Sequence, residues 1–477
     1  MGSGRKRHLP LKLETERNNR MQDQSRHSLL LTDLYELTMS AAFFENNFNP
    51  TVSFELFVRS LPEERKFLLV AGLEQALEFI RTARFSSDDI EVIRSNPLFQ
   101  KVSPGFFEYL RDLRFTGEVW AMPEGTVAFG EEPLLRVTAP IIEAQLLETY
   151  LIAEITYQTM VASKAARIVH AARGLSVVEF GTRRAHGPEA GTLAARAAYI
   201  GGCTGTSNVE AGARFNIPTV GTIAHSFVMA MPDEEEAFRA YSRVFPDSSV
   251  LLLDTYDTLA AVDKIVSAKL KPRGVRLDSG DLGELSKQVR RKLDAAGLQQ
   301  TQVLASGDLD EYRIEELLSQ GSPIDGFGVG TALVTSKDAP SLGGVYKIVE
   351  VKEAHGKSYV AKFSEDKVTY PGTKQVFRFS DEKGMFQRDL IACAGESYPQ
   401  AEQLLELVMK AGEPTVSRSL PEMQAHARRQ MDRLPAELLE FTSGANYSVR
   451  FSAELERLLQ VARVRSGSLI HSSVRRS

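Results

Sequence analysis

Hydrophobic and polar positions divide the chain into stretches with different periodicities. Between Leu31 and about Glu143, short runs alternate between apolar and polar residues, which predicts strands because successive side chains of a strand point to opposite faces. These runs lie at 52–58, 117–121 and 134–139. Residues 70–83 have helical spacing, and the apolar residues of 144–172 recur at intervals of three and four, which predicts a long helix.

From Leu175 a different unit repeats: a short apolar run, a loop containing Gly or Asp, and an amphipathic helix. The apolar runs lie at 176–180, 219–223, 250–253, 274–277, 302–305 and 324–329. The helix after Asp281 shows the form, because its apolar residues share one face and Gly297 is placed to end it. Strands that alternate with helices at this spacing pair in parallel, so the pattern predicts an α/β sheet or barrel.

After Val345 the alternating pattern returns, and helices are expected from Ala401 onward. The later strands are expected at 346–351, 359–363, 367–370 and 375–379. The fold class is therefore an irregular TIM-like α/β barrel combined with a β-rich domain built from N-terminal and C-terminal portions of the chain. The expected divisions are a disordered basic tail over 1–30, the first β-rich portion over 31–143, the barrel with the active site over 144–344, and the completing strands and helices over 345–477.

Composition narrows the class of protein further. The 477 residues are 43% hydrophobic and 25% charged, as in ordinary globular proteins, and the net charge of −5 gives no electrostatic reason to expect nucleic acid or an acidic membrane surface. Cys203 and Cys393 are the only cysteines and lie far apart, which excludes a disulfide framework. The first thirty residues lack the apolar stretch of a secretory signal, and no apolar run approaches the roughly 20 residues of a membrane helix, so we expect a cytoplasmic protein.

Polar clusters stand just past the carboxyl ends of the strands expected in the barrel. They occupy 179–184, 205–208, 224–226, 254–257, 276–281, 306–308 and 328–331. A single cluster would be explained by the Gly and Asp that turns require. Seven clusters at the edge where parallel α/β barrels build their active sites predict an enzyme site.

The glycine-containing clusters have two interpretations each. Gly328 and Gly330, followed by Thr331, suit a phosphate-binding loop at a helix start, or they only turn the chain. Gly307 and Asp308 are open to the same choice, since Asp308 would also serve as a cap for the helix that follows.

The charged clusters also have two interpretations each. Arg183 and the neighbouring Arg184 either hold phosphate oxygens or form a solvated pair. Arg276 and Asp278 alternate onto one face of a strand end, as ligand contacts or as an internal ion pair. Asp254 suits Mg²⁺, although capping a helix is its commoner role.

For two further residues, the neighbouring sequence gives little evidence of a catalytic or binding role. His225 follows the expected strand at 219–223, and a lone histidine is usually a structural hydrogen-bonding group. Tyr35 stands in an expected helix far from the barrel units, where packing is the simplest role. The residues alone therefore indicate a barrel enzyme that acts on a phosphorylated substrate.

The same stretches resemble nicotinate phosphoribosyltransferases, from about Leu31 to at least Arg450. The matching segments are 31–39 (LTDLYELTM), 54–61 (FELFVRSL), 179–187 (EFGTRRAHG), 205–211 (GTSNVEA), 221–228 (GTIAHSFV), 253–258 (LDTYDT), 274–282 (GVRLDSGDL) and 327–333 (FGVGTAL). Many separated motifs agree in order, so the resemblance is specific. Nicotinamide and, more remotely, quinolinate phosphoribosyltransferases share the architecture that it implies.

The resemblance also implies roles for individual residues. His225 resembles the catalytic histidine that ATP phosphorylates, and Tyr35 and Phe180 resemble the aromatic pair that holds the pyridine ring. Tyr35 would come from the other subunit of a homodimer with shared active sites. Thr222 and Arg276 resemble contacts to nicotinate, and a guanidinium suits the ring carboxylate.

The phosphate-binding positions follow in the same way. Those that match contacts to the sugar phosphate or diphosphate are Thr182, Arg183, Gly307, Asp308, Gly328, Gly330 and Thr331. Asp278 matches a catalytic acid near the ribose and Mg²⁺, and Asp254 is a second candidate metal ligand. Nicotinamide-specific relatives have an aspartate where Ser207 stands here; a serine donates to a carboxylate that an aspartate would repel, which favours nicotinate.

The implied activity joins nicotinate to 5-phosphoribosyl 1-diphosphate and yields nicotinate mononucleotide and diphosphate for NAD salvage. ATP would be a co-substrate of this ligase-type enzyme, acting through phospho-His225, and Mg²⁺ its metal cofactor. The alternatives are a nicotinamide phosphoribosyltransferase and a non-catalytic protein that binds a phosphosugar or pyridine. Retention of His225, Arg276 and Asp278 together argues against the second.

Overall fold

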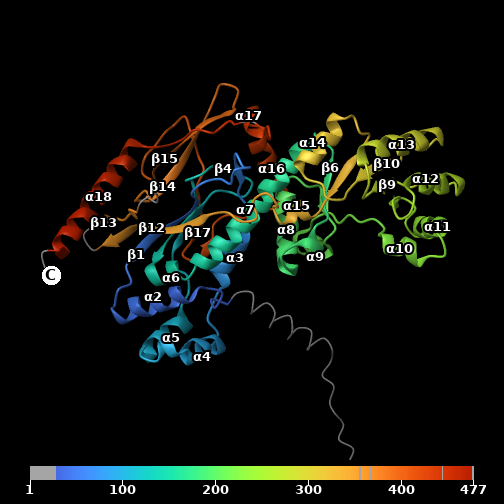
Figure 1. Cartoon of the computed structure of the whole chain (residues 1–477). Helices are drawn as coiled ribbons and strands as arrows, with labels where there is room; N and C mark the ends of the chain where they lie inside the picture. The colour runs from blue at the N-terminus through green and yellow to red at the C-terminus, as the bar shows by residue number, and fades with distance from the viewer. Residues whose placement is uncertain (1–27, 354–355, 365–367, 443, 475–477) are drawn as a thin grey trace, which may run out of the picture.

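The computed structural model describes residues 28–353, 356–364, 368–442 and 444–474; most of the expected N-terminal tail lies outside these ranges. Figure 1 shows a β-rich region on the left and an α/β region on the right, with the long helix α7 (Glu148–Ala171) between them. Helix α7 passes from one region to the other, so it packs against elements of both.

The β-rich region is built around a seven-stranded sheet with the order β13-β12-β1-β5-β3-β17-β18. Its strands are β1 (Thr51–Val58), β3 (Glu118–Ala121), β5 (Pro133–Pro140), β12 (Gly344–Glu353), β13 (Gly356–Tyr359), β17 (Glu406–Lys410) and β18 (Glu413–Pro414). Strand β1 pairs antiparallel with β5 on one side and with β12 on the other. The predicted union of N-terminal and C-terminal portions in one β-rich fold is therefore confirmed, while the exact divisions at 143 and 344 stay a prediction.

Two smaller sheets and several helices complete this region. The sheets are β16 (Glu402–Gln403)-β14 (Lys374–Ser380)-β15 (Phe386–Cys393)-β19 (Val449–Phe451) and β2 (Leu68–Leu69)-β4 (Val127–Ala128). The helices are α2 (Leu34–Glu45), α3 (Leu73–Thr82), α4 (Ser87–Ser95), α5 (Pro104–Asp112), α6 (Ile141–Gln145), α16 (Leu420–Met431), α17 (Ala436–Leu439) and α18 (Ala453–Val474).

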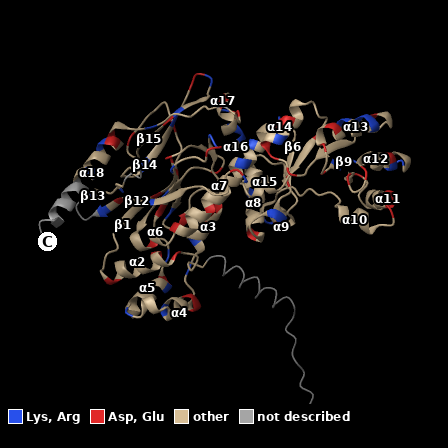
Figure 2. Cartoon of the chain, viewed as in Figure 1, with Lys and Arg blue, Asp and Glu red and all other residues tan. Residues whose placement is uncertain are grey.

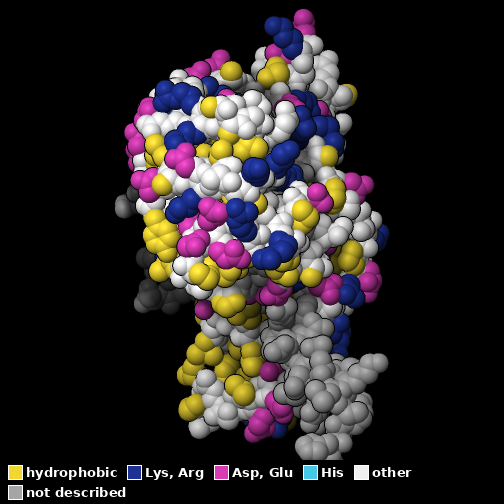
Figure 3. Space-filling view, turned by 90° about the vertical axis from the view of Figure 1, so that its right-hand side faces the viewer, with side chains coloured by type: hydrophobic (Ala, Val, Ile, Leu, Met, Phe, Trp, Pro, Cys, Tyr) yellow, Lys and Arg dark blue, Asp and Glu magenta, His cyan; other side chains and the backbone are white. Residues whose placement is uncertain are grey.

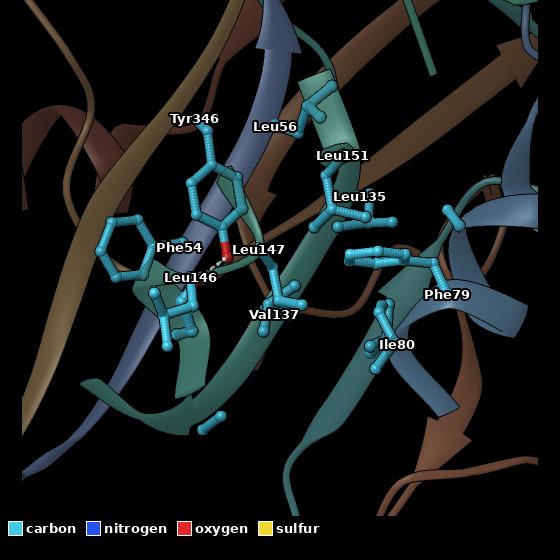
Figure 4. Close-up of a cluster of buried hydrophobic side chains, with 14 of the residues drawn as sticks. Phe54, Leu56, Phe79, Ile80, Leu135, Val137, Leu146, Leu147, Leu151 and Tyr346 are labelled. Atoms are coloured by element: carbon cyan, nitrogen blue, oxygen red, sulfur yellow. Dashed lines mark hydrogen bonds between the residues drawn. The ribbon is translucent and has the colours of Figure 1, made fainter. Parts of the chain in front are cut away.

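The core of the β-rich region joins residues that are far apart in sequence. Figure 4 shows Phe54 of β1 beside Tyr346 of β12, whose rings stack with centroids 4.7 Å apart. The buried hydroxyl of Tyr346 donates to the carbonyl of Ala144 at 3.0 Å, which satisfies its one polar group. Burial of each such aromatic side chain stabilises the fold by roughly 1.5–3 kcal/mol. Here the buried pair packs β1 against β12, which are far apart in sequence.

The α/β region holds a six-stranded parallel sheet with the order β7-β6-β11-β10-β9-β8. Its strands are β6 (Ser176–Glu179), β7 (Gly205–Thr206), β8 (Val250–Leu252), β9 (Gly274–Leu277), β10 (Gln302–Ala305) and β11 (Gly326–Val329). The helices are α8 (Pro188–Ile200), α9 (Val209–Phe215), α10 (His225–Ala230), α11 (Glu234–Val244), α12 (Thr258–Ser267), α13 (Leu282–Ala295), α14 (Glu311–Ser319) and α15 (Thr331–Val334). The parallel α/β prediction is confirmed; the sheet curls into a half-barrel.

Some expected elements are wrong. Residues 219–223 form no strand and keep only an isolated bridge between Thr219 and Thr206, because the neighbouring strand β7 ends at Thr206 and offers no further partner. The strand expected at 359–363 ends at Tyr359. Of the strand expected at 367–370, residue 367 lies outside the described ranges and the others form no strand. Short strands occupy much of 402–414, so helices resume only at Leu420.

Charge is distributed over both regions without segregation by sign. Figure 2 shows basic and acidic residues interspersed along the helices of each region. Seen from the end of the half-barrel, apolar side chains lie in small groups among basic and acidic ones (Figure 3). Across the described ranges, every helix is too short or too polar to cross a membrane.

Candidate active site

A cavity of about 240 Å³ opens at the carboxyl ends of β6, β9, β10 and β11. It is lined by Phe180, Arg183, Arg184, Arg276, Asp278, Ser306, Gly307, Asp308, Gly328, Gly330 and Thr331. Because carboxyl ends of parallel strands meet at one edge of the sheet, residues more than 150 positions apart face one space. Four of the seven predicted polar clusters contribute to this cavity.

Two glycines allow the strand ends to approach one another closely. Gly307 has φ +92°, and a Cβ there would stand 1.9 Å from the carbonyl oxygen of Asp278. A Cβ on Gly328 would stand 2.4 Å from the ring of Phe180. Both contacts are shorter than any side chain tolerates, so these positions require glycine.

A charged pair forms one wall of the cavity. The guanidinium of Arg276 donates to Asp278 at 2.9 Å and to the hydroxyl of Ser306 at 3.0 Å. Burial lowers the pKa of Arg276, while the nearby carboxylate of Asp278 favours its charged form. The internal ion pair is therefore present, and because both members also line the cavity, it holds the guanidinium in place at the site.

His225 lies beside this pair. It is the first residue of α10 rather than the residue after a strand. Its Nδ1 is 3.2 Å from the hydroxyl of Thr255, and its Nε2 is 3.9 Å from Asp278, with 41% of the side chain exposed. The hydroxyl of Thr222 donates to the carbonyl of Ile223, an oxygen that also accepts from Arg276 at 3.3 Å. The structure thus places Thr222 and His225 next to the Arg276–Asp278 pair.

Thr182 and Ser207 flank the cavity without lining it. Thr182 accepts a hydrogen bond at 3.1 Å from the side chain of Asn208. Ser207 is exposed just past β7, and its backbone N–H donates to the carbonyl of Glu179 at 2.9 Å. Thr182 is two residues after Phe180, and Ser207 is hydrogen-bonded to the residue before Phe180.

Tyr35 is not brought to the cavity within one chain. It lies in the first turn of α2, in the β-rich region, and 45% of it is exposed. Figure 1 shows α2 and the half-barrel strands on opposite sides of α7. Partial burial and the nearby carboxylates of Glu148 and Glu36 raise the pKa of its phenol, so the ring keeps its proton.

Asp254 has one carboxylate oxygen without a protein partner among the described residues. Its Oδ2 accepts from the hydroxyl of Ser279, whereas Oδ1 is buried and has no partner among the described residues. The described residues contain no group of three or more His, Cys, Asp or Glu that could hold a metal. An unpartnered carboxylate oxygen close to Arg276 still fits Mg²⁺, which is often held by one or two carboxylates together with substrate oxygens and water.

Two alternatives for aspartates are wrong. Helix α12 is capped by Asp257, which accepts from the N–H groups of Leu259 and Ala260, and not by Asp254. Helix α14 is capped by Asp310, and not by Asp308. Asp308 instead has φ +46° and lines the cavity, so capping does not explain it.

Sequence reasoning assigned no role to three hydroxyl residues that complete the site. Ser306 bonds to Arg276 and Asp278, Thr255 to His225, and Ser279 to Asp254. All three fall inside the polar clusters recognised from the sequence. Serine and threonine are frequent in turns, so only their contacts distinguish them.

A parallel half-barrel with arginines and close-packed glycine turns at its carboxyl edge defines an α/β-barrel enzyme that handles phosphorylated compounds. Residues 30–156 match the nicotinate phosphoribosyltransferase N-terminal domain, 161–339 the quinolinate phosphoribosyl transferase C-terminal domain, and 397–459 the nicotinate phosphoribosyltransferase C-terminal domain. Together these matches span the β-rich and half-barrel regions.

Similar proteins agree with these matches. Nicotinate phosphoribosyltransferase pncB2 of Mycobacterium tuberculosis is 47% identical, covering 90% of this chain and 93% of its own length. The Bacillus subtilis nicotinate phosphoribosyltransferase is 43% identical, with 79% and 78% covered. The crystal structure of human nicotinic acid phosphoribosyltransferase aligns with a TM-score of 0.79 at 30% identity, covering 90% of this chain and 99% of that one. The chain belongs to the nicotinate phosphoribosyltransferase family of enzymes.

Proposed function

We propose that this chain joins nicotinate to 5-phosphoribosyl 1-diphosphate in the cavity at the carboxyl edge of the half-barrel, as a cytoplasmic step of NAD salvage. The observation that carries the proposal is Arg276, whose partly exposed guanidinium is fixed by Asp278 and Ser306 in the wall of that cavity. A fixed guanidinium suits a planar carboxylate, which nicotinate has and nicotinamide lacks. Phe180 lines the same cavity, and its aromatic ring suits stacking on the pyridine.

The remaining cavity residues suit the sugar phosphate and diphosphate. Arg183 supplies positive charge, and the turns at Gly307–Asp308 and Gly328–Thr331 supply backbone around the cavity. Thr182 adds a hydroxyl at the rim. None of these groups requires covalent chemistry with the substrate.

The reaction is a substitution at the anomeric carbon of the ribose. The pyridine nitrogen forms the new C–N bond while the C–O bond to diphosphate breaks and diphosphate leaves with the electron pair. The sugar carries cationic character in the transition state, so the carboxylate of Asp278 stabilises it while Arg183 stabilises the departing charge. Catalysis then rests on positioning and on charge.

Mg²⁺ fits this site through Asp254 and Asp278. When bound, it supplies charge neutralisation to the diphosphate. Oδ1 of Asp254 is the better-supported ligand because it lacks a protein partner, whereas Oδ1 of Asp278 is already bonded to Arg276 and Ser306. ATP enters the proposal as a co-substrate that phosphorylates His225, whose Nε2 faces Asp278.

Substrate choice tests the function directly. The purified wild type is expected to form a mononucleotide from nicotinate far faster than from nicotinamide, with 5-phosphoribosyl 1-diphosphate as co-substrate. Arg276→Ala removes a charge-assisted contact worth roughly 1.5–3 kcal/mol, so kcat/KM for nicotinate should fall by about 10- to 150-fold.

Product formation is measured by chromatography with each pyridine. Arg273→Ala provides the control, because this arginine stands before β9 at the opposite end of the same strand. Equal use of both pyridines by the wild type would identify a nicotinamide enzyme or an unselective one. Absence of any product despite pyridine binding would identify a binding protein.

The proposal includes a homodimer that shares its active sites. Tyr35 lies with the exposed side chains of Leu31 and Leu34 on the β-rich region, away from the cavity. Beyond the half-barrel strand ends, Val209 and Met229 are 75% and 65% exposed. One chain therefore has exposed apolar side chains around Tyr35 and others near His225. In a two-fold dimer, the surface with Tyr35 on one subunit would cover the surface near His225 on the partner.

Mixing two variants that each lack ATP-coupled activity tests the shared site. Tyr35→Ala and His225→Ala chains, allowed to exchange subunits, should recover ATP-coupled activity, because each heterodimer contains one site with both residues intact. Random exchange makes about half of the dimers mixed, so about one quarter of the sites should be active. Steady-state rates before and after exchange measure the recovery.

The reverse mixture is the control. Wild type exchanged with the double variant Tyr35→Ala/His225→Ala should lose about half of its activity, because each mixed dimer then has one defect in each site. Demonstrated heterodimers without recovery in the first mixture would show that Tyr35 and His225 serve the same chain.

A further inference from the structure

Glu179 is a fully buried carboxylate at the end of β6, one residue before Phe180. One of its oxygens accepts from the backbone N–H of Gly181. The other accepts from the hydroxyl of Thr206 at 2.5 Å. A single side chain therefore joins the turn after β6 to the end of β7.

The link matters because β7 is a very short edge strand. It consists of Gly205 and Thr206, and Glu179 is paired directly opposite Thr206 in the parallel ladder. Ser207 then leaves the sheet with one ladder bond, from its N–H to the carbonyl of Glu179 at 2.9 Å. On the other side of β7, the N–H of Thr206 donates to the carbonyl of Pro218, and its carbonyl accepts from the N–H of Val220. The ladder to β6 is short, so side-chain contacts add to the bonds that hold this strand end beside the loop of Phe180.

Asn208 adds a second connection between the two loops. The hydroxyl of Thr206 accepts from the N–H of Asn208 at 2.9 Å. The Asn208 side chain caps α9 through the N–H of Ala211 and donates to Thr182 at 3.1 Å. Two side-chain hydrogen bonds therefore connect the loop after β6 with the loop after β7: Glu179 with Thr206, and Thr182 with Asn208. Glu179 is the only carboxylate in this network.

Glu179 makes no ion pair with the cations that the structure describes, so it does not act as a counter-ion for the arginines of the cavity. Burial raises the pKa of Glu179, and the hydrogen bonds from Thr206 and Gly181 oppose that rise. Neutral donors alone hold it, which suits a group that fixes geometry rather than one that binds substrate.

We propose that Glu179 is a positioning residue that fixes the distance between Phe180, on the loop after β6, and Ser207, after β7, and thereby the discrimination between a pyridine carboxylate and a pyridine carboxamide. The family resemblance implies that the hydroxyl of Ser207 donates to the carboxylate of nicotinate. It can distinguish a carboxylate from a carboxamide only if the pyridine ring is held at a fixed place. This inference rests on the proposed function. It adds a specificity-determining carboxylate that itself touches no substrate.

Thr206→Val removes the hydrogen bond between the two loops, and Glu179→Gln weakens it. With its one acceptor oxygen on the N–H of Gly181, the amide of Gln turns an NH2 group toward Thr206, so the carboxylate acceptor is lost and only a neutral bond in the reverse direction is left. In both variants KM for nicotinate is expected to rise about tenfold, while kcat changes less than about threefold. The preference for nicotinate over nicotinamide should fall by a similar factor, and Thr206→Ser should restore it.

Glu143→Gln is the matched control, because Glu143 also accepts from a backbone N–H and a hydroxyl, both of Thr116, but in the β-rich region. It should leave the selectivity unchanged. If it altered selectivity as Glu179→Gln does, general destabilisation would explain both and the proposal would be wrong.

Amide hydrogen exchange gives a readout that needs no activity. In Glu179→Gln and Thr206→Val, peptides covering 180–184 and 204–209 should exchange about tenfold faster than in the wild type. Unchanged exchange there would overturn the positioning role. A wild type that makes no product from nicotinate would defeat the proposed function, and the exchange result would still decide whether Glu179 holds the loops.

Discussion

Incubation with labelled ATP and Mg²⁺ is expected to place one acid-labile phosphate on each wild-type chain and none on His225→Ala. Nδ1 of His225 is within hydrogen-bond distance of Thr255, which leaves Nε2, 3.9 Å from Asp278, directed toward the cavity wall. In the phosphorylation step Nε2 forms a bond to the γ-phosphorus while the bond to ADP breaks. The resulting phosphoramidate is labile in acid and stable in base, unlike a phosphoserine.

His186→Ala is the control for this experiment. His186 lies in the conspicuous loop after β6 and is exposed, yet it does not line the cavity. It should keep the full label. Because ATP assists the ribosyl transfer without supplying its atoms, His225→Ala should also keep a slow activity that does not depend on ATP. Label that survives the loss of His225 would move the assignment to another residue.

The largest loss of stability is expected from Arg378→Met. Arg378 and Asp389 are both fully buried and form a double hydrogen bond across β14 and β15, with Glu132 4.0 Å from the guanidinium. Removing the cation leaves two carboxyl groups in the core, and the free energy of unfolding should fall by about 3–5 kcal/mol. Urea unfolding measures the change.

The loss should depend on pH. Burial and the neighbouring Asp389 already hold the pKa of Glu132 well above its usual value. Arg378 opposes that rise, so without it the pKa of Glu132 rises further. The folded state then binds more protons than the unfolded state, and stability falls as pH rises. Relative to the wild type, Arg378→Met should therefore lose less free energy of unfolding at pH 5 than at pH 8.

An exposed pair provides the comparison. Arg457 and Glu454 form an i,i+3 pair on α18 with side chains 61% and 42% exposed. Arg457→Met should leave the free energy of unfolding almost unchanged, because solvent screens this pair. A loss in Arg378→Met that is as small, or that is the same at both pH values, would contradict a structural role for the buried cluster.

Most long elements could be predicted from periodicity because each buries one face against a single core. The early strands β1, β3 and β5 and five of the six half-barrel strands fall where the pattern indicates. Strand β15 gave no such pattern, because Arg388 and Asp389 interrupt it and Asp389 is buried by its ion pair rather than by apolarity. Strands of two residues, such as β16, are too short to show any period.

The site was predictable where parallel strands bring their ends together. That rule gathers the clusters around Arg276, Asp278, Gly307 and Gly328 without knowledge of their contacts. It could not show that Glu179 points back into the sheet, since a carboxylate beside a strand end is usually solvated. Nor could it place Tyr35, because no periodicity relates a helix of the β-rich region to a site that a second chain would complete.

The order of strands in the seven-stranded sheet has a consequence for synthesis on the ribosome. Strand β1 receives one partner, β5, soon after it is made, but the other, β12, begins at Gly344, about 200 residues after β5 ends. At roughly 5–20 residues per second, its second edge stays open for about 10–40 s. An open apolar edge is a template for wrong pairing. The half-barrel is translated during that interval, so the part of the chain made first is the part whose native fold is finished last.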